Sequence, residues 1–143
     1  MKRILVVDDD VNYARCISLF LAKQGYAVNV AGDGREAMAL VSETWPDLIL
    51  LDVAMPVMDG MSFAHVLRSI ERWAHLPILV VTASSLDPLK EMLETGIVQN
   101  VMIKSRFSLR QLVAEIERLT ADFVTGDESP RARIRREPAC QAV

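Results

Sequence analysis

Short apolar runs alternate with amphipathic stretches along this chain, and that alternation constrains the fold more than any other feature. Five runs rich in Val, Ile and Leu have the length of β-strands, and the segments between them show helical periodicity. This order predicts βαβ units around a parallel sheet, an α/β fold. The predicted strands are Arg3–Asp8, Ala27–Ala31, Leu48–Asp52, Ile78–Thr82 and Val101–Lys104.

Three of the runs are apolar without interruption and should form the centre of the sheet. A strand that helices cover on both faces needs no polar side, whereas a half-exposed strand alternates polar and apolar residues. The uninterrupted runs are Ile4–Val7, Leu48–Leu51 and Ile78–Val81.

Capping signals mark the helices between the strands. Segments 33–36 and 108–111 have the form of capping boxes. Asp87-Pro88 supplies another helix start, and Gly96 stands where that helix should end. We predict the remaining helices over Val11–Gln24, closed by Gly25, and over Met61–Arg72.

Length and composition predict one domain followed by a tail. The 143 residues fit a single domain. After Thr120 the helical period ends, and Gly126, Pro130 and Pro138 interrupt the chain. We therefore expect a domain over residues 1–121 and a mobile C-terminal tail over residues 122–143. Because so short a tail cannot bury a core, we expect no effector domain.

Charge and hydropathy argue against several classes of partner and site. The chain holds 16 Lys and Arg against 19 Asp and Glu, a net charge of -3, which gives no electrostatic case for binding nucleic acid. Its apolar runs are too short for a membrane span or a secretory signal, so we expect no membrane partner and a cytoplasmic protein. Cys16 and Cys140 lack the spacing of a zinc or disulfide framework.

Polar residues stand at the carboxyl ends of the predicted strands, where a parallel α/β sheet places its functional site. Converging carboxylates repel one another unless a cation lies between them. Mg²⁺ prefers oxygen ligands and commonly joins one or two carboxylates to a phosphoryl group. We predict Asp9 and Asp52 as direct ligands and Asp8 as a ligand through water. The residues at the strand ends are Asp8, Asp9, Asp10, Asp52, Thr82 and Lys104.

This set of groups suits phosphoryl transfer to a carboxylate. The metal would neutralise a phosphoryl group on one aspartate, while Lys104 and the hydroxyl of Thr82 bind its other oxygens. The predicted product is an aspartyl phosphate.

From about Lys2 to Thr120 the sequence resembles the receiver domain of two-component response regulators, in its single-domain, CheY-like form. This resemblance implies a flavodoxin-like, doubly wound sheet of five parallel strands in the order 2-1-3-4-5, with five helices. The residues that carry it are the Asp8-Asp9 pair after Ile4–Val7, the run Asp52–Gly60, Thr82-Ala83, Gly96 and Lys104.

The resemblance also implies a role for each site residue. Asp52 would be the phosphoacceptor, Thr82 the switch hydroxyl and Lys104 the phosphoryl contact. Mg²⁺ would be bound by Asp8, Asp9, Asp52 and the backbone carbonyl of Ala54.

The implied function is phosphorelay signal transduction in a two-component system. A histidine kinase or phosphotransfer protein would supply the phosphoryl group from a phosphohistidine, and the receiver would signal by binding a downstream protein. Such a receiver is not an enzyme beyond its own phosphorylation and dephosphorylation.

Two residues depart from the family pattern. Ser105 stands where receivers usually carry a proline in a cis bond. A cis bond to another residue costs about 2.5–4 kcal/mol, so the bond is either trans in a reshaped loop or cis and strained. Val101 stands where receivers usually carry a Tyr or Phe that swings inward during switching. We therefore hypothesise that the phosphorylation chemistry is retained while its transmission to the output face is altered.

Two other functions stay open at this point. Ser105 and Val101 would suit a phosphorylation-independent adaptor with a receiver fold. An enzyme on the same scaffold, such as an Asp-based phosphatase or an FMN-binding protein, is the second alternative. Against that second alternative, no Gly-rich or Ser/Thr-rich phosphate loop follows the first predicted strand.

Overall fold

The computed structural model of the chain describes residues 1–53, 60–83 and 89–121. Its centre is one sheet of five parallel strands in the order β2-β1-β3-β4-β5, which confirms the flavodoxin-like fold and the central place of the three uninterrupted apolar runs. The fifth strand begins one residue earlier than predicted and ends before Lys104. The strands are β1 Arg3–Val7, β2 Ala27–Ala31, β3 Leu48–Leu51, β4 Ile78–Thr82 and β5 Asn100–Ile103.

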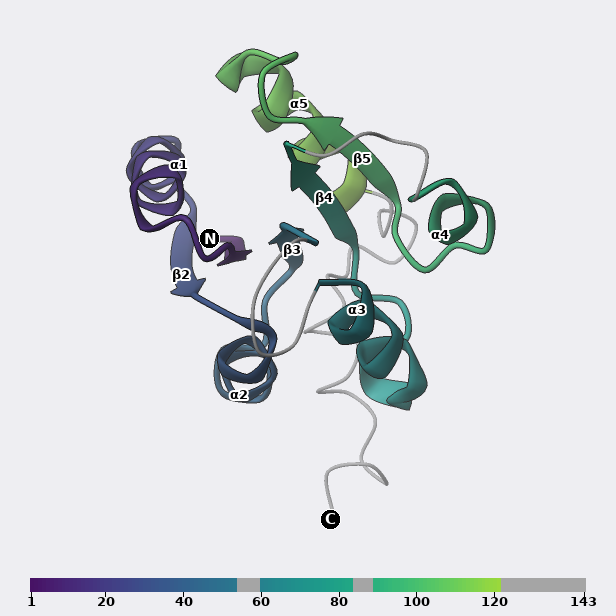
Figure 1. The fold of residues 1–143 in the computed structure, drawn as a ribbon. Coiled ribbons are helices and arrows are strands. Elements are labelled where there is room, and N and C mark those ends of the chain that lie inside the picture. Colours follow the sequence, from purple (N-terminus) through teal and green to yellow (C-terminus); the bar gives the residue numbers. More distant parts are fainter. Residues whose placement is uncertain (54–59, 84–88, 122–143) are drawn as a thin grey trace.

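Helices cover both faces of the sheet (Figure 1). One face packs against α1 (Val11–Lys23) and α5 (Leu109–Thr120), whose buried side chains share a core with alternate residues of the central strands. The other face packs against α2 (Gly34–Thr44), α3 (Gly60–Ser69) and α4 (Lys90–Glu94). Since both faces are covered, the central strands have no polar side, and every residue of β3 and β4 is buried.

The predicted caps of α2 and α5 are present in the structure, and the predicted glycine follows the end of α1. Asp33 accepts a hydrogen bond from the Glu36 N–H at 2.9 Å, and Ser108 forms a complete capping box with Gln111. After α1, Gly25 has a φ of +99°, a left-handed conformation that glycine adopts without strain. Asp87-Pro88 lies outside the described residues, and α4 begins at Lys90.

The helix predicted over Met61–Arg72 is shorter in the structure. It ends at Ser69, Ile70 is extended, and a short 3-10 turn, η1, follows over Glu71–Trp73. The break allows Trp73 to reach the core, where it is 3% exposed and packs edge-to-face on Trp45 with ring centroids 5.3 Å apart. Burial of a large aromatic side chain therefore overrides the helical periodicity of this segment.

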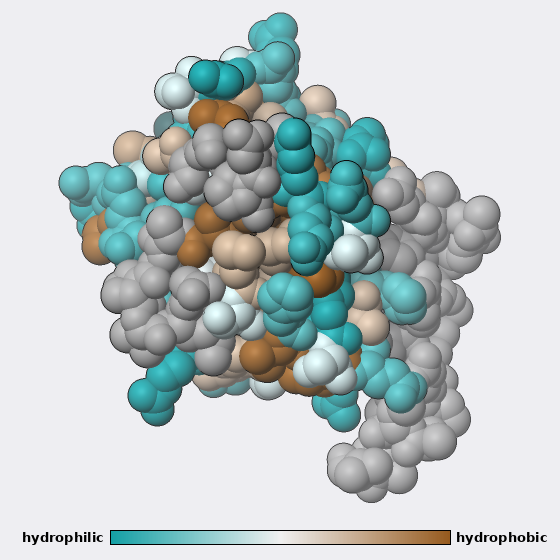
Figure 2. All heavy atoms as spheres, turned by 45° about the vertical axis from the view of Figure 1, so that its right-hand side comes forward, coloured by the Kyte–Doolittle hydropathy of each residue, from teal (hydrophilic) through white to brown (hydrophobic). Residues whose placement is uncertain are grey.

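The side of the molecule that carries α3 and α4 is turned forward in Figure 2. Hydrophilic side chains cover much of its described surface, and hydrophobic ones appear in separate areas between them. None of the described helices has the length and apolar character needed to cross a membrane.

Candidate functional site

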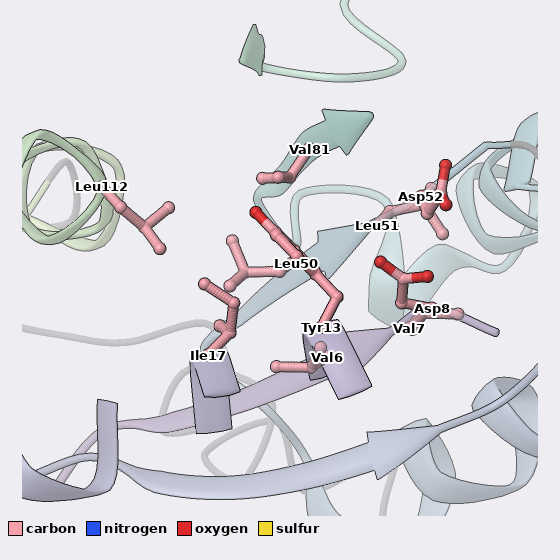
Figure 3. A pocket seen from close by; sticks show the side chains of 10 residues that line it. All are labelled: Val6, Val7, Asp8, Tyr13, Ile17, Leu50, Leu51, Asp52, Val81 and Leu112. Carbon is pink, nitrogen blue, oxygen red and sulfur yellow. The ribbon is translucent and has the colours of Figure 1, made fainter. Parts of the chain in front are cut away.

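The sheet brings four of the predicted site residues to one edge. Asp8 directly follows β1, Asp52 follows β3, Thr82 ends β4 and Lys104 follows β5. Backbone hydrogen bonds continue the ladder past the strand ends, from Asp52 N–H to the Val7 carbonyl at 2.9 Å and from Lys104 N–H to the Thr82 carbonyl at 2.9 Å. These bonds fix the register, so the side chains are held by the sheet itself. Figure 3 shows the carboxylates of Asp8 and Asp52 near each other at one end of a pocket whose other lining residues are mostly apolar.

Three carboxylates converge at this edge. Asp8, Asp9 and Asp52 each place one oxygen within 4.8 Å of the others. Asp8 is 4% exposed and Asp52 7% exposed, whereas Asp9 faces solvent. A purely oxygen donor set of this kind fits a hard divalent cation such as Mg²⁺, and an exposed member leaves room for water ligands. The site therefore has the chemistry that the sequence predicts for magnesium.

Burial acts against the charge of Asp8. It raises the pKa of Asp8 above its usual value, and hydrogen bonds from Lys104 and from the Asp10 N–H oppose that rise without cancelling it. The negative charge of Asp52 raises the pKa further. A bound cation would remove this penalty, because it stabilises the ionised form of both carboxylates.

Lys104 supplies the positive charge of the site. Its Nζ donates to Asp8 Oδ2 at 2.8 Å and lies 3.5 Å from Asp52 Oδ2. Burial lowers the pKa of Lys104, but the hydrogen bond to Asp8 and the charges of Asp8 and Asp52 outweigh it, so the net shift is upward. Lys104 is therefore held in its charged form between the two buried carboxylates.

Thr82 contacts the other oxygen of Asp52. Its hydroxyl donates to Asp52 Oδ1 at 3.1 Å, and the residue is 1% exposed. Lys104 approaches Oδ2 of the same carboxylate, so each oxygen of Asp52 faces a hydrogen-bond donor. The structure thus brings Asp8, Asp9, Asp52, Thr82 and Lys104 together as predicted.

Tyr13 is a member of this site that the sequence analysis missed. Its ring lies under Lys104, with Nζ 4.2 Å from the ring centroid. Asp10 caps α1 by accepting from the Tyr13 N–H at 3.1 Å. Tyr13 is therefore at the start of the helix, next to the carboxyl end of β1, four residues before the buried Ile17.

Three further predictions for the site concern Ala54, Ser105 and Val101. Ala54, expected to offer its backbone carbonyl to the metal, lies outside the described residues. Among the residues that the structure describes no peptide bond is cis, so the bond between Lys104 and Ser105 is trans. Val101 is partly buried and packs against the core on the face that α2, α3 and α4 cover.

The family model of the response regulator receiver domain matches residues 4–117. The chain belongs to this family. The match confirms the resemblance seen in the sequence, and it assigns the acidic pocket of Asp8, Asp9 and Asp52 to a receiver of two-component signalling. The individual roles of the site residues and the boundary of the tail stay predictions.

Similar proteins agree with this assignment. The receiver is 39% identical over 118 residues to the transcriptional regulatory protein PrrA of Mycobacterium leprae, a match that covers 82% of this chain and 49% of PrrA. The chain thus spans about half the length of that relative. The chemotaxis protein CheY4 of Vibrio cholerae is 31% identical, with a TM-score of 0.76 over 83% of this chain and 98% of CheY4. TrrA of Thermotoga maritima, solved in complex with Mg²⁺ and BeF, is 29% identical with a TM-score of 0.72, covering 83% of this chain and 99% of TrrA.

Replacing Lys104 by methionine should destabilise the metal-free receiver and strengthen its Mg²⁺ binding. Without the ammonium, two buried carboxylates lose their cation, and we expect the free energy of unfolding in chelator to fall by about 2–3 kcal/mol. The same loss of positive charge should raise Mg²⁺ affinity roughly three- to tenfold. Urea unfolding with and without Mg²⁺ measures both effects.

The matched control is Lys23→Met, which removes an exposed lysine at the end of α1. It should change neither quantity appreciably. Equal Mg²⁺ affinity in Lys104→Met and wild type would contradict the placement of this ammonium beside the metal site.

Proposed function

We propose that this receiver accepts a phosphoryl group on Asp52 from the phosphohistidine of a histidine kinase or phosphotransfer protein and then signals by binding a downstream protein. One observation carries the proposal. A single carboxylate, that of Asp52, lies beside two further carboxylates and has a hydroxyl on one oxygen and an ammonium on the other. This is the arrangement that phosphoryl transfer to a carboxylate requires.

The reaction forms an oxygen–phosphorus bond at Asp52 while the nitrogen–phosphorus bond of the donor imidazole breaks. Asp8, Asp9 and Asp52, with the Ala54 carbonyl, would hold Mg²⁺. Bound Mg²⁺ supplies positive charge to the carboxylates and to the transferred group. Lys104 reaches Asp52 Oδ2 at 3.5 Å, so its ammonium can donate to a phosphoryl oxygen with little movement. Thr82 can turn its hydroxyl from Asp52 Oδ1 to another phosphoryl oxygen.

Three findings support the proposal. The donors to Asp52 are buried or half-buried, so water competes weakly for them. The register bonds of β3 and β5 hold the backbones of Asp52 and Lys104, which limits the reorganisation needed during transfer. TrrA, a similar protein, is known in complex with Mg²⁺ and BeF, which is consistent with Mg²⁺ as the cofactor here.

Incubation with acetyl phosphate and Mg²⁺ should add one phosphoryl group to the intact protein, as seen by mass spectrometry. Chelation of Mg²⁺ should reduce the modified fraction by at least tenfold, because three carboxylates would then repel the donor. No added phosphoryl mass in the presence of Mg²⁺ would refute the proposal. Chelator without effect would refute the metal's part in it.

The conformational change that follows phosphorylation should be small near β5. Val101 has no ring to swing inward, and it already packs against the core on the face that α2, α3 and α4 cover. We therefore expect amide exchange around Val101 to change less than twofold when a phosphoryl mimic, beryllofluoride with Mg²⁺, binds the site. Strong protection or deprotection of residues 100–103 would contradict this expectation.

A phosphorylation-independent adaptor is the second candidate, because Ser105 and Val101 both depart from the receiver pattern. An adaptor would bind its protein partner with equal affinity in wild type and in Asp52→Asn. A phosphorylation switch would bind that partner differently after phosphorylation of the wild type alone.

A further inference from the structure

Tyr13 lines the same pocket as Asp8 and Asp52 and lies beside their carboxylates (Figure 3). Figure 3 shows its phenol oxygen at the end of the ring that points away from Asp8 and Asp52. Within the described ranges this hydroxyl makes no hydrogen bond to another residue. Any contribution of Tyr13 to the site must therefore come from the face of its ring rather than from its hydroxyl.

The ring face meets the ammonium group of Lys104. The Lys104 ammonium has three N–H donors, of which one lies on Asp8 at 2.8 Å and another is aimed at Asp52 at 3.5 Å. The ring lies 4.2 Å from the same nitrogen, within the range of a cation–π interaction. The ring attracts the ammonium without taking up a donor, so a third N–H stays available for a phosphoryl oxygen.

We propose that Tyr13 is a positioning residue that holds the Lys104 ammonium between Asp8 and Asp52, where it meets the phosphoryl group during transfer. This inference rests on the proposed function of Asp52 and Lys104. It adds a residue of α1 to a site otherwise built from strand ends, and the ring acts through Lys104 without touching the reacting atoms.

The backbone of this chain gives a reason why such support matters. Lys104 directly follows the last residue of β5, and a flexible stem of four carbons carries its ammonium. The next residue is Ser105, which lacks the ring that constrains the backbone of a proline. A backbone hydrogen bond to the Thr82 carbonyl anchors Lys104. The ring of Tyr13 supplies a rigid surface on the side of the ammonium that faces α1.

A simpler explanation is that Tyr13 only fills space. It lines a small pocket together with apolar side chains of the sheet, α1 and α5, and it packs on the core of that face. Phe20 allows the two explanations to be separated, since it is a second half-buried aromatic residue of α1 on the same core. Phe20 instead borders a surface groove with Arg110, Val113 and Glu117.

The test compares Tyr13→Leu, Tyr13→Phe and Phe20→Leu by their rates of phosphorylation at several acetyl phosphate concentrations with saturating Mg²⁺. Loss of the ring should lower the maximal rate of Tyr13→Leu by about tenfold, the size expected for a partly desolvated cation–π contact. Tyr13→Phe should retain the wild-type rate, because it keeps the ring face. Phe20→Leu should lose stability but keep its rate.

Nuclear magnetic resonance of the Lys104 side chain gives a second measurement that needs no reaction. In wild type and Tyr13→Phe, the protons next to Nζ should be shifted upfield by the ring, and in Tyr13→Leu they should return to ordinary lysine values. If Tyr13→Leu does not fold, the wild-type spectrum decides, because unshifted Lys104 protons overturn the proposal.

The outcomes separate this inference from the proposed function. A wild-type protein that takes up no phosphoryl group refutes the function, and the Lys104 spectrum then decides the positioning alone. A phosphorylated wild type with an equal rate in Tyr13→Leu overturns the positioning role. So does a Tyr13→Phe rate as low as that of Tyr13→Leu, which would assign the effect to the hydroxyl.

Discussion

Asp52→Asn should take up no phosphoryl group from acetyl phosphate and Mg²⁺, while the wild type becomes modified. Asparagine has the same shape and can still accept the Thr82 hydrogen bond at the carboxamide oxygen, so the fold should be kept. It has no anionic oxygen to form a bond to phosphorus. We expect complete loss of modification, measured as the mass of the intact protein.

The substitution should also leave the metal-free fold at least as stable as the wild type. Asp8 and Asp52 are buried carboxylates that repel one another, and asparagine removes one of the two charges. Unchanged or higher stability would establish that the loss of modification is chemical and does not result from unfolding.

Asp33→Asn is the matched control for Asp52→Asn. Asp33 caps α2 at the surface, and asparagine is an equally good N-cap, so both stability and modification should be unchanged. A phosphoryl group that persists on Asp52→Asn would reveal a different acceptor and remove Asp52 from the mechanism.

Gly60→Ala should strongly destabilise the fold next to the site. A Cβ at Gly60 would overlap the Cα of Val53 and lie 2.5 Å from the carbonyl oxygen of Asp52, and both atoms belong to the backbone. Backbone cannot move aside as a side-chain tip can. We expect the free energy of unfolding to fall by about 2–4 kcal/mol, measured by urea unfolding.

The overlap would also disturb phosphorylation. Gly60 donates its N–H to the Val53 carbonyl at 3.0 Å, a bond that ties the start of α3 to the residue after Asp52. Displacement of that backbone would move Asp52 from its donors, so Gly60→Ala should become modified more slowly as well. Gly32→Ala is the control, because its Cβ would lie 3.6 Å from the tip of the flexible Glu36 side chain. Equal stabilities of the two variants would contradict the close approach at Gly60.

The strand-end rule explains why most of the site could be predicted. Parallel strands direct their carboxyl ends to one edge, so the polar residues that follow apolar runs must meet there whatever the details of the loops. Asp8, Asp52 and Lys104 needed only the strand positions, and an error of one residue at β5 left Lys104 in place. Their meeting is a consequence of topology.

Two features could not be predicted because they depend on packing between distant segments. Ile70 becomes extended so that Trp73 can reach Trp45, a contact across two segments far apart in sequence. Tyr13 has an apolar ring that fits an ordinary core position, and only the approach of Lys104, the residue after β5, distinguishes it. Helical periodicity describes one segment at a time and contains neither contact.

The pair of Trp45 and Trp73 gives the protein an optical reporter that is separated from its chemistry. These are the two tryptophans of the sequence, and they precede β3 and β4 at the amino ends of the strands, opposite the edge that carries Asp52 and Thr82. A strand of four residues separates the two edges by about 13 Å. Tryptophan emission should therefore report unfolding around α2 and α3 and should not respond to ligands at Asp52. The stability of the fold and the occupancy of the site can then be measured on one sample as independent signals.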